Sequence, residues 1–190
     1  MKPWSRLERR TVVDDAWVKF HGDRVELPNG QVIDPYWVLE EHDWVLEEHD
    51  WVHVVAFDPD GRVPLVRQYR YACDVVSLEF PGGLLDAGED PVAAARRELL
   101  EETGCAVAEC RLVGYVYPNP ARQRNRQYCV IATGLRRVAA QALDHSEAIE
   151  VEYLRLSEIP ARIASGEFCQ GLHIATLQLA LQNLPPGVEA

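Results

Sequence analysis

The chain has 190 residues, of which 47% are hydrophobic, and it carries a formal net charge of −11. This length and composition suit one core with an added element. The negative charge argues against a general nucleic-acid surface, because binding to a phosphate backbone needs a basic footprint, but it does not exclude a small phosphorylated substrate bound through a metal. No apolar run is long enough to span a membrane, so we expect neither nucleic acid nor a membrane as a partner.

The cysteines form an odd set without C-x-x-C spacing, which argues against a zinc site or a disulfide framework. They are Cys73, Cys105, Cys110, Cys129 and Cys169. The N-terminal stretch MKPWSRLERR lacks the apolar core of a signal peptide. We therefore expect a reduced, cytoplasmic setting.

Residues 1–50 are predicted to form a small antiparallel sheet that precedes the rest of the fold. Within residues 24–33, a Pro-Asn-Gly turn signal separates two alternating runs, which is typical of a hairpin. Trp4 and Trp17 are candidates for stacking on a base. For either one alone, packing in a sheet or a dimer interface is the commoner role of a large aromatic side chain.

The seven residues WVLEEHD occur twice in succession, at 37–43 and 44–50. Two heptads are too few for a coiled coil. Because seven is odd, one straight strand through both copies would turn corresponding side chains to opposite faces. We predict that the extra copy is absorbed in a loop, bulge or lengthened hairpin away from the functional site, and that His42 and His49 are surface histidines rather than metal ligands.

From residue 51 onward, two runs with strand character are separated by an Asp-Pro-Asp-Gly turn. The runs WVHVVAF and RVPLVRQYRY are predicted to form a second hairpin. A third strand, 75–80, leads into Pro-Gly-Gly at 81–83, where glycine lets the backbone approach a ligand closely. We assign residues 51–190 to a second domain.

A helix is predicted after Asp90, which is followed by proline and therefore suits the N-cap. Gly104 suits the left-handed residue that closes the helix. An apolar stripe of Val92, Ala95 and Leu99 can dock on a core while the acidic residues face outward.

Three glutamates of this helix, Glu98, Glu101 and Glu102, fall within one turn. Like-charged pairs at this spacing cost a few tenths of a kcal/mol each, so a purely structural helix gains nothing from them. A divalent cation would remove the repulsion, since Mg²⁺ is held by a few carboxylates together with water and substrate phosphates.

The segment GLLDAGEDPVAAARRELLEETGC, residues 83–105, resembles a complete Nudix box. The resemblance implies an α/β (α+β) fold, an α/β/α sandwich with a mixed sheet, and hydrolysis of nucleoside diphosphates linked to another moiety. It also implies Mg²⁺ or Mn²⁺ as cofactor. The implied metal ligands are Glu98, Glu101, Glu102 and the carbonyl of Gly82.

In the same resemblance, Arg97 pairs with the box carboxylates and fixes their orientation, and Glu89 supports the metal shell. The base that accepts the proton of the attacking water is Glu147 or a box glutamate, so the catalytic candidates are Arg97, Glu101, Glu102 and Glu147. His145 is a second candidate base. A solvated acidic loop at 141–153 is the alternative reading for Glu147.

Further residues resemble the ADP-ribose pyrophosphatase and nucleotide-sugar branch of this family. Gln68-Tyr69-Arg70 and Glu79-Phe80-Pro81-Gly82-Gly83 match its patterns, and Pro120 stands fifteen residues after Cys105. The resemblance implies that Arg70 contacts substrate phosphate or sugar and that Glu79 accepts hydrogen bonds from sugar hydroxyls. For Arg70, a surface ion pair worth under about 1 kcal/mol is the alternative.

The sequence departs from that branch after Pro120, where three arginines replace the usual Pro-Gly and acidic residues. Arg122, Arg124 and Arg126 can clamp a diphosphate, for which guanidinium groups are suited, or pair with acidic residues across a dimer. The departure keeps nucleotide sugars other than ADP-ribose open.

Near the C-terminus, a short helix is predicted at 157–166 and a final amphipathic helix at 172–184. His173 in the last helix is expected to be a satisfied surface or core histidine rather than a ligand.

Taken together, these patterns and the resemblance imply metal-dependent hydrolysis of a nucleoside diphosphate sugar such as ADP-ribose, giving a nucleoside monophosphate and a sugar phosphate. The resemblance to the ADP-ribose pyrophosphatase branch also implies a homodimer assembled through the N-terminal sheet. Hydrolysis of a dinucleotide or dinucleoside polyphosphate is the first alternative. A non-catalytic ADP-ribose sensor is the second, and the intact box and the lack of a basic helix-turn-helix stretch argue against it.

Overall fold

The computed structural model describes residues 4–15, 18–27, 29–41, 49–70, 73–121, 124–143 and 148–188. The chain divides into two compact units. The first contains residues 1–49 and 117–126, and the second contains residues 50–116 and 127–190. The sequence-based boundary after residue 50 left the segment 117–126 out of the first unit.

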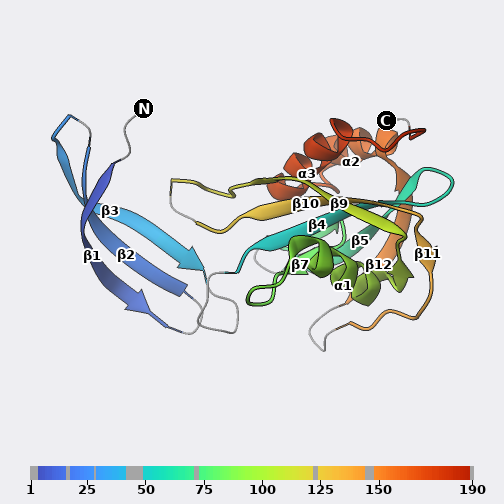
Figure 1. The fold of residues 1–190 in the computed structure, drawn as a ribbon, viewed down its shortest axis with the longest axis horizontal. Helices are drawn as coiled ribbons and strands as arrows, with labels where there is room; N and C mark the ends of the chain where they lie inside the picture. Colours follow the sequence, from blue (N-terminus) through green and yellow to red (C-terminus); the bar gives the residue numbers. More distant parts are fainter. Residues whose placement is uncertain are drawn as a thin grey trace. The chain divides into compact units, whose positions relative to one another are not determined.

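The first unit contains a small antiparallel sheet in the order β1-β2-β3 (Figure 1). Its strands are β1 (Ser5–Asp14), β2 (Val18–Glu26) and β3 (Val32–Glu41). Between β2 and β3, Gly30 has a φ of 83° and its amide donates to the carbonyl of Leu27, a turn conformation that glycine adopts without strain. The predicted N-terminal antiparallel sheet is confirmed.

The first copy of the WVLEEHD repeat begins in β3. Residues 42–48, which include His42 and most of the second copy, lie outside the described residues, so the placement of the extra heptad stays a prediction. His49 lies just before β4, and its carbonyl accepts a hydrogen bond of 2.6 Å from the side-chain amide of Asn125.

The second unit is a mixed α+β sandwich. Its strands are β4 (Trp51–Phe57), β5 (Arg62–Arg70), β6 (Val75–Glu79), β7 (Gly82–Leu84), β8 (Cys105–Ala106), β9 (Glu109–Val116), β10 (Gln127–Thr133), β11 (Arg136–Arg137) and β12 (Ile149–Arg155). One sheet has the order β7-β4-β10-β9 and another the order β12-β5-β6, while β8 and β11 pair separately. The strands β4 and β10 run parallel and the other pairs antiparallel, so the predicted mixed sheet is confirmed.

Helices cover both sides of these sheets, with α1 on one side and α2 and α3 on the other (Figure 1). They are α1 (Pro91–Thr103), α2 (Ile159–Ser165), which follows the 3-10 turn η1 (Leu156–Glu158), and α3 (Gly171–Leu181). The last helix ends earlier than residue 184, the end that the sequence predicted. Among the described residues, no helix has the length and apolar character needed to cross a membrane.

The strand β4 separates two hydrophobic clusters. Val52, Val54 and Ala56 pack in the cluster that contains Leu99 of α1. Val55 and Phe57 pack in the cluster of α2 and α3, which includes Ile159, Phe168 and Leu177. Because successive side chains of a strand point to opposite faces, a strand covered on both faces is apolar nearly throughout, as the run WVHVVAF is.

The helix α1 has the ends that its sequence predicts. Asp90 accepts hydrogen bonds from the amides of Val92 and Ala93 at 2.9 and 3.1 Å, and Gly104 closes the helix with a φ of 69°. These caps satisfy amides and carbonyls that a helix end leaves unpaired, so the start and end of α1 are determined locally.

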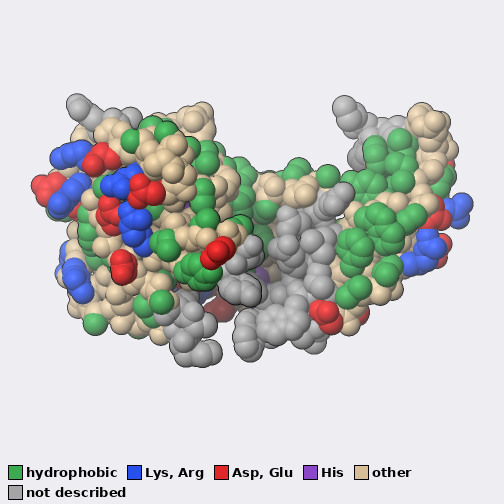
Figure 2. All heavy atoms as spheres, turned by 180° about the vertical axis from the view of Figure 1, so that it is seen from behind, with side chains coloured by type: hydrophobic (Ala, Val, Ile, Leu, Met, Phe, Trp, Pro, Cys, Tyr) green, Lys and Arg blue, Asp and Glu red, His purple; other side chains and the backbone are tan. Residues whose placement is uncertain are grey.

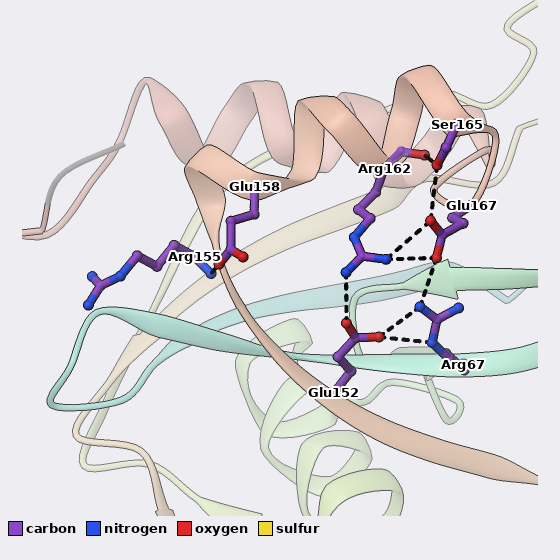
Figure 3. A network of polar contacts seen from close by, with 7 residues as sticks. All are labelled: Arg67, Glu152, Arg155, Glu158, Arg162, Ser165 and Glu167. Carbon is purple, nitrogen blue, oxygen red and sulfur yellow. Dashed lines mark hydrogen bonds and ion pairs between the residues drawn. The ribbon is translucent and has the colours of Figure 1, made fainter.

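A ring of alternating charges joins β5, β12 and the segment around α2 (Figure 3). Arg67 donates to Glu152 and Glu167, both at 2.8 Å. Arg162 donates to the same two carboxylates, at 3.1 Å to Glu152 and 2.9 Å to Glu167. Because each arginine bridges both glutamates, the ring is neutral and links three elements that are distant in sequence.

Because of this ring, we expect the free energy of unfolding to depend on pH. The hydrogen bond from Arg67, followed by those from Arg162 and Ser165, lowers the pKa of Glu167 from 4.5 to about 2. A carboxyl whose folded pKa is depressed stabilises the fold above its unfolded pKa, and this contribution is lost as the pH falls through the folded value. We expect Glu167→Gln to lower the free energy of unfolding at neutral pH, and we expect its difference from the wild type to shrink between about pH 4.5 and 2.

Urea unfolding at a series of pH values measures this difference. Glu109→Gln, at an exposed position of β9, is the matched control because it removes one carboxylate away from the ring. A difference between Glu167→Gln and the wild type that stayed constant down to pH 2 would contradict the assignment.

Candidate active site

The three glutamates of α1 share one helical turn but lie in different environments. The side chain of Glu101 is 42% exposed and that of Glu98 is 13% exposed, while Glu102 is buried, with 5% of its surface exposed. The prediction that all the acidic side chains face outward is therefore wrong for Glu102. The reason is that Glu102 finds a hydrogen-bond donor inside the protein.

That donor is the backbone of β7. The amide of Gly82 donates to Oε2 of Glu102 at 2.8 Å. A Cβ atom placed on Gly83 would lie 2.5 Å from Oε1 of Glu98, so the carboxylate of Glu98 lies directly against the same strand. A Cβ on Gly82 would lie 2.0 Å from the carbonyl oxygen of Val52 on β4. The two glycines thus allow β7 to lie between β4 and the carboxylates of α1.

Arg97 connects the acidic residues of the box. Its guanidinium donates to both carboxylate oxygens of Glu89, at 3.1 and 2.8 Å, to Glu98 at 2.7 Å and to Glu101 at 3.3 Å. It also donates to the carbonyl of Leu84 at 2.9 Å. The hydrogen bond with Glu89 is the largest cause of a raised pKa of Arg97 and of a lowered pKa of Glu89. Arg97 therefore offsets part of the repulsion between the glutamates.

The donor set fits a hard divalent cation. The carboxylates of Glu102 and Glu98 both lie against the same short segment of β7, at Gly82 and Gly83. Among the described residues, no three acidic, histidine or cysteine side chains form a ready-made metal cage. Mg²⁺ does not need one, because it usually binds through one or two carboxylates and keeps water and substrate phosphates in its shell.

Arg70 and Glu79 form a second polar group in the same unit. Arg70 donates through Nε to Glu79 at 2.9 Å and also through Nη2. The side chain of Glu79 is 2% exposed and that of Arg70 is 44% exposed, so this is not the surface ion pair that the sequence left open. Burial opposes ionisation of Glu79, but the hydrogen bonds from Arg70 and His173 outweigh it and lower the pKa of this carboxyl.

Sequence reasoning missed the residues that support Glu79. His173 of α3 lies 3.1 Å from Glu79 through Nε2, and its ring stacks on that of His53 of β4 at 3.7 Å. Both histidines are buried. A histidine within the apolar run of β4, and another in the apolar helix α3, were the available signals.

The positions of the other predicted site residues relative to these groups are not defined. Trp4, Arg124 and Arg126 belong to the first unit, where Trp4 packs edge-on against Tyr36, and their contacts with substrate stay predictions. The predictions for Trp17, Arg122, His145 and Glu147 lie outside the described residues.

Family models match most of the chain. A Nudix domain model matches residues 47–170, and a model of the nucleoside diphosphate sugar hydrolase N-terminal domain matches residues 4–39. The chain belongs to the Nudix family. It is a Nudix hydrolase, and Nudix hydrolases generally need divalent metal ions.

Individual relatives agree with this assignment. The Nudix hydrolase is 32% identical to an ADP-ribose pyrophosphatase of Mycobacterium tuberculosis over 174 residues, which cover 90% of this chain and 80% of the relative. It is 33% identical to a GDP-mannose pyrophosphatase of Klebsiella pneumoniae over 61% of this chain and 62% of the relative. Its fold matches a crystal structure of an ADP compounds hydrolase with a TM-score of 0.82, over 96% of this chain and 94% of that one, at 21% identity.

The contact between Gly83 and Glu98 gives a test of the metal site. We expect Gly83→Ala to fold, because the added methyl meets only the end of a flexible side chain, and to weaken Mn²⁺ binding by at least about tenfold, because it displaces Glu98. Mn²⁺ titration followed by electron paramagnetic resonance measures the affinity, and thermal unfolding measures the stability.

Gly171→Ala is the control, because no atom lies within 4 Å of a Cβ at that position. Gly82→Ala is expected to be destabilised instead, since its methyl meets the backbone of β4. Unchanged Mn²⁺ affinity in Gly83→Ala would refute the placement of Glu98 in the metal site.

Proposed function

We propose that this Nudix hydrolase cleaves the pyrophosphate bond of a nucleoside diphosphate sugar such as ADP-ribose, giving a nucleoside monophosphate and a sugar phosphate, with Mg²⁺ or Mn²⁺ as cofactor. The observation that carries the proposal is the convergence of Glu98 and Glu102 on the backbone of Gly82 and Gly83. Such a group of hard oxygen donors, beside a further exposed carboxylate, suits the handling of a metal–diphosphate complex.

The chemistry follows from charge. The anionic oxygens of a diphosphate repel a nucleophile, and a bound divalent ion supplies neutralisation of that charge and a more acidic water. Glu98, Glu102 and the carbonyl of Gly82 would hold the ion. Glu101 is exposed enough to accept a proton from water, a role for which Glu147 remains the other candidate. Arg97 keeps the carboxylates of Glu98 and Glu101 in place.

Arg70 is a further group of the second unit that suits a diphosphate substrate. Its side chain is nearly half-exposed, and the buried Glu79 fixes the guanidinium through two hydrogen bonds. A planar guanidinium held in this way suits bidentate binding of a phosphate group. The pyrophosphatases of ADP-ribose and GDP-mannose among the relatives support a nucleotide sugar over a dinucleotide.

A panel of compounds tests the proposal. With Mg²⁺ or Mn²⁺, we expect ADP-ribose and other nucleotide sugars to be hydrolysed to phosphomonoesters, which a coupled phosphatase converts to inorganic phosphate. The same assay with NADH and diadenosine polyphosphates is expected to give much slower phosphate release. Faster turnover of the dinucleotides would overturn the substrate assignment.

Glu102→Gln tests the role of this carboxylate in the chemistry. Its amide oxygen can still accept the Gly82 amide, so the fold is expected to persist. Loss of the negative charge is expected to lower kcat by roughly a thousandfold, which corresponds to several kcal/mol of transition-state stabilisation. Near-wild-type turnover of Glu102→Gln would show that Glu102 does not act in the site.

We also propose that the chain forms a homodimer through the N-terminal sheet, in a cytoplasmic setting consistent with its free cysteines. Among the strands that the structure describes, the edge strand β1 pairs with β2 alone, and an unpaired edge invites another strand. Figure 2 shows hydrophobic side chains gathered on this sheet. The exposed large apolar residues there are Trp4, Leu7, Val12, Val13, Val32 and Trp37.

A charge placed on β1 tests the dimer. Val12 is 58% exposed in the single chain, so Val12→Asp is expected to leave the fold intact and shift the wild-type dimer to monomer in size-exclusion chromatography with light scattering. Leu112→Asp, at an exposed position of β9, is the control for an added charge. A monomeric wild type, or a Val12→Asp dimer of unchanged stability, would contradict the proposal.

A further inference from the structure

The protonation of His173 can be read from its hydrogen bonds. Its Nδ1 lies 3.1 Å from the backbone nitrogen of Phe80. A backbone amide only donates, so Nδ1 accepts and carries no proton. The proton of the neutral ring is therefore on Nε2, which lies 3.1 Å from Oε2 of Glu79 and donates to it.

The ring of His173 is held from several directions. His53 stacks on it with an interplanar angle of 11°, and Phe168 packs against it edge-on at 6.1 Å. Nδ1 of His53 lies 2.9 Å from the hydroxyl of Thr176, which is one helical turn beyond His173. Burial is the largest cause of lowered pKa values for both histidines, which agrees with two neutral rings in contact.

The contacts continue from the ring toward the surface. Glu79 accepts a hydrogen bond from Nε2–H of His173 at Oε2, and it accepts hydrogen bonds from the guanidinium of Arg70 at both carboxylate oxygens. Only Arg70 in this chain of contacts is substantially exposed. A carboxylate with donors on two sides has a defined plane, and a planar guanidinium bound to it in bidentate fashion shares that orientation.

We propose that His173 is a positioning residue for substrate binding: its Nε2–H fixes the carboxylate of Glu79, which in turn aims the guanidinium of Arg70 at the substrate. The proposal rests on the proposed function, in which Arg70 contacts phosphate or sugar. It assigns to the C-terminal helix α3 a part in substrate affinity.

Two substitutions separate the two hydrogen bonds of His173. The amide of glutamine reaches the position of Nε2 and can donate to Glu79. The amide of asparagine reaches the position of Nδ1 and can accept from Phe80, but it leaves Glu79 without this donor. If His173 acts through Glu79, His173→Gln retains the function and His173→Asn loses it, whereas a purely structural role predicts no such order.

Steady-state kinetics with ADP-ribose give the first readout. We expect His173→Asn to raise KM by roughly tenfold, the effect of losing one hydrogen bond to a charged group, with kcat changed by less than about threefold. His173→Gln is expected to stay within about threefold of the wild type in both constants. In the background of Arg70→Lys, the effect of His173→Asn should largely disappear, because both changes act on one interaction.

A second readout needs no substrate. The Nε–H of Arg70 can be assigned in ¹H–¹⁵N NMR spectra by its absence in Arg70→Lys. We expect this signal to keep its position in His173→Gln and to shift and exchange faster with water in His173→Asn. If neither asparagine nor glutamine is tolerated at 173, Glu79→Gln tests the same chain of contacts at its middle member and is expected to give the same shift and faster exchange of the Arg70 signal.

The two readouts distinguish failure of the positioning role from failure of the proposed function. An Arg70 signal that is unchanged in folded His173→Asn overturns the positioning role, whatever the substrate. A changed signal in an enzyme that hydrolyses no nucleotide sugar supports the positioning role and refutes the proposed function.

Discussion

The approach of the backbone at Gly82 and Gly83 to both α1 and β4 determines the arrangement of the site. A side chain at Gly82 would collide with the carbonyl of Val52, and one at Gly83 would collide with Glu98. The amide of Gly82 then becomes available to the buried Glu102. Burying an ionised carboxylate is costly unless hydrogen bonds compensate it, so this backbone contact is what permits an acidic residue on the inner face of α1.

Arg97 offsets the repulsion between the crowded acidic groups of the box. One guanidinium bonds Glu89, Glu98 and Glu101, which a lysine could not do, because its ammonium lacks the planar fork. The glutamates are therefore ordered before a metal binds.

The sequence predicts the local features of this protein well. The ends of α1 follow from Asp90 and Gly104, whose capping chemistry acts within a few residues. The apolar run of β4 follows from its coverage on both faces. The box itself, with Gly83 through Glu102, could be recognised as a unit because its function depends on fixed spacing.

Contacts between distant segments could not be predicted in the same way. Glu102 faces inward because β7 supplies an amide, and its helical position alone does not reveal this. Hydrogen bonds to Glu79 from Arg70 and from His173 join β5, β6 and α3. These residues are too far apart in sequence for a helical or strand period to predict the contacts. The sequence predicted that His173 would be a histidine with its hydrogen bonds satisfied, and the structure agrees. Its partners, Phe80 and Glu79, could not be predicted from the sequence.

The two faces of β4 contact different parts of the candidate site. Its residues Val52 and Val54 pack toward α1, which carries the acidic cluster, whereas His53 stacks on His173 of α3. The segment from Glu79 to Gly83 is bonded to both sides, to α3 through Glu79 and Phe80 and to α1 through Gly82. Because this short extended segment is held at both ends, it has little conformational freedom of its own. The proposed substrate contact at Arg70 and the proposed metal ligands of α1 therefore both adjoin this one segment of backbone, and α3 bonds to it through His173.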